Sequence, residues 1–226
     1  MDSVGRHMDP QARLYEFRFP AAARRKKDAL WRVLCRAYFQ RWIGAQDVVL
    51  DVGCGFGEFL NHIRCGRRIG VDTNPQSRTC LEPGIEFQVS GADRLDFLPD
   101  AAVDVVFCSN VLEHMPDKKT VDAVLAEVWR TLRPGGRFIV MGPNIRYLSG
   151  AYWDFWDHHV AITDRALVEA LHASGFEIER CIPRFLPFST RGALPQAPWL
   201  VRLYLAIPAV WRIMGRQFLV IGRRPA

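Results

Sequence analysis

The chain has 226 residues, of which 49% are hydrophobic and 24% are charged, so it can bury one sizeable core and is not of disordered composition. No apolar run reaches the roughly 18 residues that a transmembrane helix needs, and residues 1–20 contain no apolar stretch of signal-peptide type. We therefore expect a cytoplasmic protein, with peripheral contact at the inner membrane left open.

The charges are distributed unevenly along the chain. Residues 1–46 carry ten basic residues against four acids, residues 47–179 carry twelve against twenty, and residues 180–226 carry eight arginines and no acid. The basic ends are either ordinary solvated surface or faces for an anionic partner, such as a phosphorylated substrate or a lipid surface. The six cysteines include no C-x-x-C pair, so we expect reduced thiols and no zinc site.

The first predicted element is a basic amphipathic helix over residues 21–43, within an N-terminal helical lid (1–46) that precedes a larger domain (47–226). The apolar run at 48–50 predicts a buried strand, which a glycine-rich turn and the start of a helix follow. Further strands are predicted at residues 68–71, 85–89, 103–108, 138–141, 176–184 and 217–223.

Two later helices have clear boundary signals. Thr120 is a candidate cap for a helix with apolar residues at helical spacing, which residues 133–136 end. Thr163 is a candidate cap for another helix, which Gly175 ends. Residues 184–216 are expected to form a substrate-side insertion before the last strand, with an apolar helix that Pro208 interrupts.

Strands that alternate with helices indicate an α/β fold with a mostly parallel sheet and helices on both faces. In such sheets the ligand lies beyond the carboxyl ends of the strands. We therefore expect four groups of residues to gather at one edge of the sheet: 51–57, Asp72, Asp93 and 109–114.

Gly53, Gly55 and Gly57 lie at alternate positions, where glycine permits positive φ and close approach of the backbone to a ligand. A dinucleotide site would instead have G-x-G-x-x-G, so a nicotinamide dehydrogenase is disfavoured. Asp72 follows the next strand, and its carboxylate could accept hydrogen bonds from two ribose hydroxyls. Taken singly, the glycines could form only a turn, and Asp72 or Asp93 could be a plain helix cap.

Five motifs, in order along residues 48–179, resemble those of class I S-adenosylmethionine (SAM)-dependent methyltransferases. They are residues 51–57 for the first glycine motif, 70–72 for the ribose, 91–93 for the adenine, 105–115 for the methionine half and 132–138 for the turn before the fifth strand. The resemblance implies an enzyme with a Rossmann-like seven-stranded sheet and SAM as cofactor. The cofactor-binding residues that it implies are Asp51, Gly53, Cys54, Gly55, Gly57, Asp72, Thr73, Ala92, Asp93, Arg94, Ser109, Asn110, Val111 and His114.

Transfer of a methyl group to a hydroxyl is helped by a general base, and the candidates are His114, His158 and His159. His114 could equally pack against the cofactor without moving a proton. The candidate substrate-binding residues are Tyr152, Trp153, Asp154, Asp157, Arg184 and Ser189. The aromatic residues among them suit a sugar ring or a flat phenol, or form a buried cluster. No metal is expected, although a set of Asp154, Asp157 and His158 stays open.

We expect methylation of a hydroxyl on a sugar or on a glycan or lipid-linked precursor, because the tail resembles that of bacterial glycan methyltransferases. The alternatives are O-, C- or N-methylation of a phenolic, quinone or polyketide-like molecule, and a SAM-binding module without catalysis. A nucleic-acid substrate is not expected, because Ser109–Leu112 stands where a Pro-Pro-Tyr-type motif would follow the fourth strand. Residues 196–216 could lie on a membrane face or dock on the fold and line the pocket.

Overall fold

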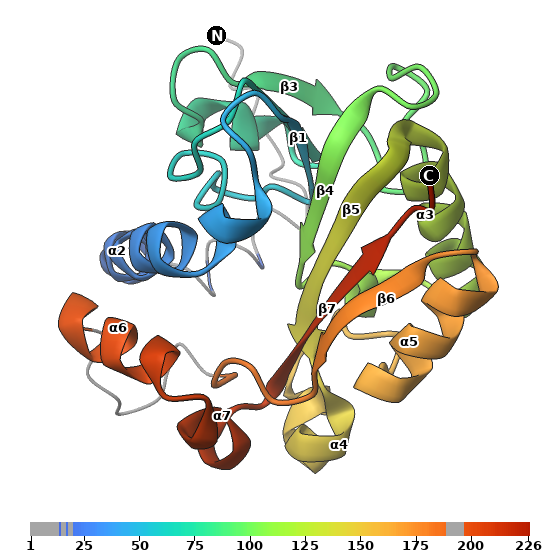
Figure 1. The fold of residues 1–226 in the computed structure, drawn as a ribbon. Helices are drawn as coiled ribbons and strands as arrows, with labels where there is room; N and C mark the ends of the chain where they lie inside the picture. The colour runs from blue at the N-terminus through green and yellow to red at the C-terminus, as the bar shows by residue number, and fades with distance from the viewer. Residues whose placement is uncertain (1–13, 15–16, 18–19, 189–196) are drawn as a thin grey trace, which may run out of the picture.

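The computed structural model describes Leu14, Phe17 and residues 20–188 and 197–226. Seven strands within these ranges form one sheet in the order β3-β2-β1-β4-β5-β7-β6 (Figure 1). They are β1 (Val48–Val52), β2 (Arg67–Asp72), β3 (Glu86–Val89), β4 (Val103–Ser109), β5 (Leu132–Pro143), β6 (Glu177–Ile182) and β7 (Gln217–Arg223). All neighbours from β3 to β5 are parallel, and β7 is antiparallel to both β5 and β6. The mostly parallel sheet that the sequence predicts is confirmed.

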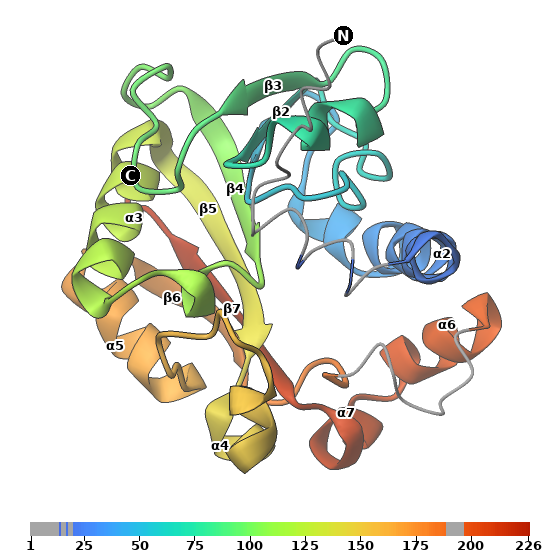
Figure 2. The ribbon, with the colours of Figure 1, turned by 180° about the vertical axis from the view of Figure 1, so that it is seen from behind.

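Helices connect the strands and lie on both faces of the sheet (Figures 1 and 2). The α-helices are α2 (Ala21–Ala37), α3 (Lys118–Thr131), α4 (Ile145–Leu148), α5 (Asp164–Ala173), α6 (Pro198–Ala206) and α7 (Pro208–Met214). The short 3-10 helices are η1 (Phe39–Trp42), η2 (Pro75–Cys80), η3 (Leu112–His114) and η4 (Ser149–Asp154). The Rossmann-like α/β architecture therefore follows from chain order as expected.

Alternation of side chains along the strands divides the core into two layers. On one face, Leu50 and Val52 of β1 join the helices α3 and α5 in a buried cluster. On the other face, Val49 of β1 joins a cluster that includes buried residues of α2, α6 and α7. Because both faces of β1 and β4 are covered, these strands are almost continuously apolar, as buried parallel strands require.

The N-terminal helix α2 is fastened to the sheet by aromatic rings. Phe107 of β4 stacks on Phe59 with ring centroids 3.8 Å apart, and Phe39 and Trp31 contact Phe107 edge-on. These four side chains are buried. Helix α2 therefore shares the core of the sheet, and the boundary of a separate lid near residue 46 stays a prediction.

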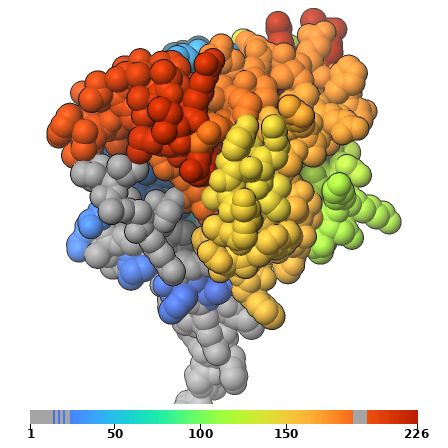
Figure 3. Space-filling view, turned by 90° about the horizontal axis from the view of Figure 1, so that it is seen from below, coloured from blue at the N-terminus to red at the C-terminus, as the bar shows by residue number. Residues whose placement is uncertain are grey.

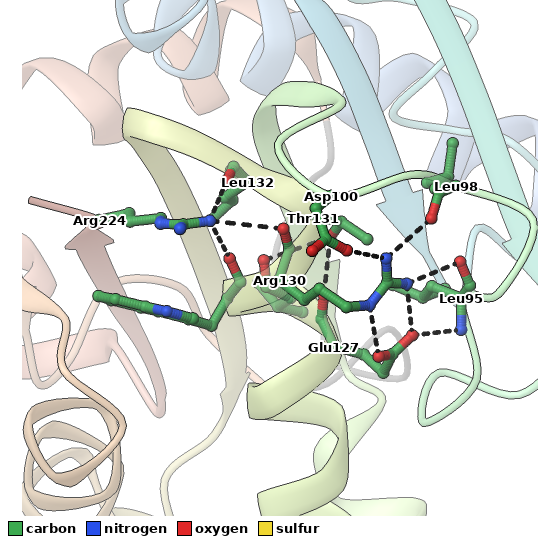
Figure 4. A network of polar contacts seen from close by, with 10 residues as sticks. Leu95, Leu98, Asp100, Glu127, Arg130, Thr131, Leu132 and Arg224 are labelled. Atoms are coloured by element: carbon green, nitrogen blue, oxygen red, sulfur yellow. Dashed lines mark hydrogen bonds and ion pairs between the residues drawn. The ribbon is translucent and has the colours of Figure 1, made fainter. Parts of the chain in front are cut away.

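Arg130, near the end of α3, holds the loop between β3 and β4 (Figure 4). Its guanidinium donates to the carbonyls of Leu95 and Leu98 at 3.0 and 2.9 Å and pairs with Glu127. Glu127 in turn accepts from the N–H of Leu95 at 2.8 Å. Charge-assisted bonds of this kind fix the loop that follows the tip of β3.

Three local predictions are wrong. Residues 53–62 form successive turns and no regular helix, because three closely spaced glycines there have positive φ. The predicted helix over 21–43 ends at Ala37, and a 3-10 turn then buries Phe39. The cap of α3 is Asp117, whose carboxylate accepts from the N–H of Thr120 at 2.7 Å, whereas the predicted cap Thr163 of α5 is confirmed.

Candidate functional site

The loop that leaves β1 is held against the tip of β2. The N–H groups of Gly53 and Cys54 both donate to the carbonyl of Val71, at 2.8 and 2.9 Å. Gly53 has φ +72°, and a Cβ at this position would overlap the side chain of Val111 beyond β4. The positive φ agrees with the prediction from the sequence, and the glycine also lets this loop approach the β4 tip closely.

Asp72 is the last residue of β2, and its side chain holds the glycine-rich loop that leaves β1. One carboxylate oxygen accepts from the N–H of Gly55 and the other from the N–H of Asn74, both at 2.8 Å. Burial raises the pKa of Asp72, and the backbone donors oppose that shift. Thr73 beside it is exposed. The half-buried carboxylate thus lies at the strand tip where the resemblance expects a ribose.

A second carboxylate lies in the sheet directly before the loop. Asp51 is 3% exposed, and its pKa is raised well above the usual value by burial first and then by Glu58 and Asp72. Lys27 of α2 lowers the pKa of Asp51 and forms an ion pair with Glu58 at 2.9 Å. Three neighbouring carboxylates give this edge of the sheet an acidic character that suits a cationic ligand such as a sulfonium.

The tips of β3 and β4 complete this edge. The N–H of Ser90 donates to the carbonyl of Asp72 at 3.2 Å, which places the turn containing buried Ala92 beside the β2 tip. The carboxylate of Asp93 lies close to Gly91, and a Cβ on Gly91 would overlap it. Arg94 follows, and its N–H closes the turn onto the carbonyl of Gly91 at 3.2 Å.

Asn110 begins the segment after β4 with φ +55°, a left-handed conformation that asparagine tolerates better than most residues. Its N–H donates to the carbonyl of Met141 at 2.9 Å, and its amide donates to the Ser109 hydroxyl at 3.1 Å. The structure therefore brings the predicted cofactor residues of β1 to β4 to one edge of the sheet. Three features of this edge fit the adenosine and the sulfonium of SAM. They are the glycine backbone without side chains, the carboxylate of Asp72 at the expected ribose position, and the neighbouring acidic groups.

Two of the three candidate histidines lie together beyond β4. They are His114 and His158, whose ring centroids are 5.0 Å apart. Nδ1 of His114 bonds to the carbonyl of Asp157 at 2.9 Å, and Nδ1 of His158 bonds to the carbonyl of Tyr152 at 2.8 Å. His159 is separate, since its side chain is exposed.

Glu113 is the functional candidate that the sequence prediction omits. It is 3% exposed, and burial raises its pKa to about 7, against the opposing charge of His114. Its carbonyl accepts from the N–H groups of His159 and Val160, which ties the β4 tip to the later loop. The Glu-His dipeptide at 113–114 could have pointed to this residue. A dipeptide alone, however, does not show which residues from distant parts of the chain lie near it.

The predicted substrate residues are placed differently from one another. Tyr152 is fully buried, with its hydroxyl bonded to the Val160 carbonyl, whereas Trp153 and Asp154 are exposed. Asp157 lies beside His114, with a carboxylate oxygen 3.3 Å from Nδ1. The guanidinium of Arg184 donates to the carbonyls of Ile213 and Gly215 and lies over the ring of Tyr147. Ser189 lies outside the described residues.

The segment with α6 and α7 presents apolar side chains to solvent. Trp199, Leu203 and Ile207 are four residues apart and 65%, 50% and 40% exposed. The opposite side of α6–α7 packs on the fold through buried Leu205 and Trp211. Figure 3 shows this segment beside the α4 region on one face of the molecule. Within the described residues no helix is long and apolar enough to cross a membrane.

Comparison with known proteins identifies the family of the chain. The methyltransferase domain family matches residues 50–140, which contain the four strand tips. A Mycolicibacterium smegmatis protein named as a probable SAM-dependent methyltransferase is 30% identical over 185 residues, covering 72% of this chain and 70% of that protein. The chain belongs to the SAM-dependent methyltransferases. This methyltransferase is an enzyme that uses SAM, and the cofactor identity predicted from the sequence is confirmed.

Other relatives are similar over shorter stretches or in fold alone. A ubiquinone biosynthesis O-methyltransferase of Idiomarina loihiensis is 35% identical over 43% of this methyltransferase and 44% of its own length. A SAM-dependent methyltransferase of Archaeoglobus fulgidus has 21% identity and a TM-score of 0.66, over 94% of this chain and 99% of its own. The methyltransferase in complex with the Trm112 activator of Haloferax volcanii has 20% identity and a TM-score of 0.69, over 94% and 98%.

Proposed function

We propose that the enzyme methylates a hydroxyl of a sugar or of a glycan or lipid-linked precursor. The observation that carries this proposal is the cluster of Glu113, His114 and His158 beyond β4, beside the edge where the cofactor residues gather. A hydroxyl is a poor nucleophile while it keeps its proton, and this cluster supplies groups that handle protons. SAM, when bound, supplies the methyl group on a sulfonium that leaves as a thioether.

The residues of this chain have two tasks in such a reaction. Gly53, Gly55 and Asp72 orient the cofactor at the strand tips. His114 faces the acceptor side with about a quarter of its side chain exposed. Because its Nδ1–H donates to the Asp157 carbonyl, its Nε2 lone pair is available to take a proton.

The exposed residues near this cluster support a polyhydroxylated acceptor. Trp153 is 53% exposed, and Trp156 is 87% exposed. The exposed carboxylate of Asp154 lies between them in the sequence. Aromatic planes combined with carboxylates bind sugar rings through stacking and hydrogen bonds to hydroxyls.

A second candidate acceptor is a phenol or quinol. The observation that favours it is the 35% identity to a ubiquinone biosynthesis O-methyltransferase over 109 residues. The same exposed aromatic side chains would stack on a flat ring. Both candidates are oxygen nucleophiles and place the same demand on the Glu113–His114–His158 cluster.

We also propose that the α6–α7 surface contacts an anionic membrane, which would bring a lipid-linked acceptor to the site. The exposed apolar residues Trp199, Leu203 and Ile207 have Arg202 and Arg212 beside them. No acid occurs between residues 180 and 226. Apolar side chains flanked by arginine favour an interface with anionic lipid.

The proposed function is tested with radiolabelled SAM and three acceptor pools: free sugars, lipid-linked sugars and phenols or quinols. Release of S-adenosylhomocysteine that depends on a sugar-containing pool, with label in the sugar, is the expected result. Transfer confined to the phenolic pool would establish the second candidate instead. Transfer to none of the pools, with SAM binding intact, would contradict both.

A further inference from the structure

Glu113, His114 and His158 each offer one ligand atom, and these atoms all lie within 4.8 Å of one another. We propose that the three residues hold a first-row divalent transition-metal ion. The three come from two separate segments, the turn after β4 and the loop before α5. Backbone bonds from His159 and Val160 to the Glu113 carbonyl hold these two segments together.

The orientation of both imidazoles supports ligation. A carbonyl oxygen only accepts, so the bonds to Asp157 and Tyr152 require hydrogen on Nδ1 of each histidine. Each ring therefore directs an Nε2 lone pair away from its carbonyl partner. Metal-ligating histidines in proteins are commonly fixed in this way, with the other ring nitrogen donating to a carbonyl or a carboxylate.

The burial of Glu113 is the second argument. Its carboxylate is 3% exposed, and its ion-pair partner His114 lies 4.0 Å away. Burying a carboxylate is costly unless a close cation compensates its charge. A divalent ion would supply that charge and join the carboxylate to both rings.

The ligand atoms lie within 4.8 Å of one another and must move closer together to bind one ion. Ligand atoms on a tetrahedral ion with bonds of about 2.0–2.2 Å are about 3.4 Å apart. The 4.0 Å between Nε2 of His114 and Oε1 of Glu113 must therefore shorten by about half an ångström. His114 has 27% of its side chain exposed, so an ion can reach its ring from solvent.

The ligand types indicate the class of ion. Two imidazoles and one carboxylate suit zinc, iron, cobalt or nickel, whereas magnesium and calcium prefer oxygen ligands. Three protein ligands leave coordination positions open, as in catalytic rather than structural sites. The set differs from the alternative of Asp154, Asp157 and His158 considered from the sequence, because it replaces two carboxylates with Glu113 and His114.

An open position would bind an oxygen of the acceptor and lower the pKa of its hydroxyl, a consequence that rests on the proposed function. The two histidines would then act as ligands, and the proton of the bound hydroxyl would pass to solvent. The metal site itself does not depend on the identity of the acceptor.

The test uses the full chain, stripped with a chelator and dialysed, with Co²⁺ as the probe. Titration followed by visible absorption is expected to show saturation at one ion per chain, with the bands of a site of low coordination number. His158→Ala and Glu113→Gln are expected to weaken Co²⁺ binding at least tenfold. His159→Ala is the matched control: it removes an exposed imidazole one residue away and is expected to bind Co²⁺ as the unaltered chain does.

Circular dichroism and calorimetry with SAM verify that each variant is folded, and His158→Gln replaces His158→Ala if the latter is not. Absence of Co²⁺ binding by the unaltered chain, or equal binding by His158→Ala, Glu113→Gln and His159→Ala, would overturn the proposal. Turnover of sugar acceptors without Co²⁺ binding would refute the metal site alone. Co²⁺ binding without transfer to any sugar acceptor would refute the proposed function alone.

Discussion

The carboxylate of Asp72 accepts a hydrogen bond from the backbone N–H of Gly55 at 2.8 Å. The side chain that the sequence predicts to hold the ribose of SAM therefore also holds the glycine-rich loop after β1. Its other oxygen accepts from the N–H of Asn74, so the carboxylate is oriented before any ligand arrives. Binding then costs little reorganisation at this residue.

Asp72→Ala is expected to weaken SAM binding by about 1–3 kcal/mol, because it removes charge-assisted hydrogen bonds and the support of the glycine loop. Isothermal titration calorimetry with SAM measures the loss. Asp122→Ala, at an exposed position of α3, is the control and should bind SAM normally. Unchanged affinity in Asp72→Ala would exclude the ribose role.

Asp51→Asn is expected to change how stability depends on pH. The pKa of Asp51 in the folded chain is raised above its usual 3.8, by burial first and then by Glu58 and Asp72, with Lys27 opposing. The stabilisation from the protonated form is complete below about pH 3.8 and is lost as the pH rises through the folded pKa. The Tm of Asp51→Asn, measured without SAM, should therefore exceed that of the unaltered chain by a margin that grows with pH. A margin that stays constant between acidic and neutral pH would argue against this interpretation.

Gly53→Ala is expected to destabilise the fold by about 1–3 kcal/mol, because alanine is strained at positive φ and its Cβ would overlap Val111. Urea denaturation measures the change. Gly150→Ala is a suitable control, since a Cβ there meets nothing within 4 Å. The double variant Gly53→Ala/Val111→Ala removes the overlap and retains the φ strain, so partial recovery is expected. Equal stability of the two single variants would contradict the close approach.

His114→Ala is expected to lower kcat by roughly 100-fold while SAM affinity stays nearly unchanged, because His114 belongs to the cluster that is proposed to activate the acceptor hydroxyl. Single-turnover assays at saturating SAM measure the rate. His172→Ala, in the last turn of α5 and exposed, is the control. A normal rate in His114→Ala would remove this residue from the chemistry.

The double variant Trp199→Gln/Leu203→Gln is expected to reduce binding to vesicles that contain anionic lipid, because it removes two exposed apolar side chains from α6. Co-sedimentation with vesicles of mixed neutral and anionic lipid measures binding, and purely neutral vesicles should capture less. Phe97→Gln removes an exposed aromatic residue elsewhere on the surface and is the control. Equal capture of all three proteins would argue against a membrane role for α6.

The sequence predicted that the candidate cofactor residues gather at one edge of the sheet, because backbone geometry determines that arrangement. Gly53, Gly55 and Gly57 have positive φ, and Asp72 follows a strand whose parallel neighbours end at the same edge. The order of strands and most of their bounds follow from the same apolar pattern. Only the helix expected after Gly57 is absent, since three such glycines in five residues favour turns.

The acceptor side was harder to predict because its contacts join distant segments. His158 meets His114 through a loop whose path depends on the buried ring of Tyr152 and on backbone bonds to Glu113. No periodicity or spacing encodes such a path. Arg184 illustrates the same difficulty, because an arginine in a candidate substrate loop donates to carbonyls of its own chain.

The position of β7 has a consequence for biosynthesis. Residues 217–223 insert between β5 and β6, which were made earlier by the ribosome and do not pair with each other. Until residues 217–223 emerge, the edges of β5 and β6 that will pair with β7 are open, and open edges promote association with other chains. A nascent chain of this enzyme must therefore remain protected until β7 has been synthesised and has paired.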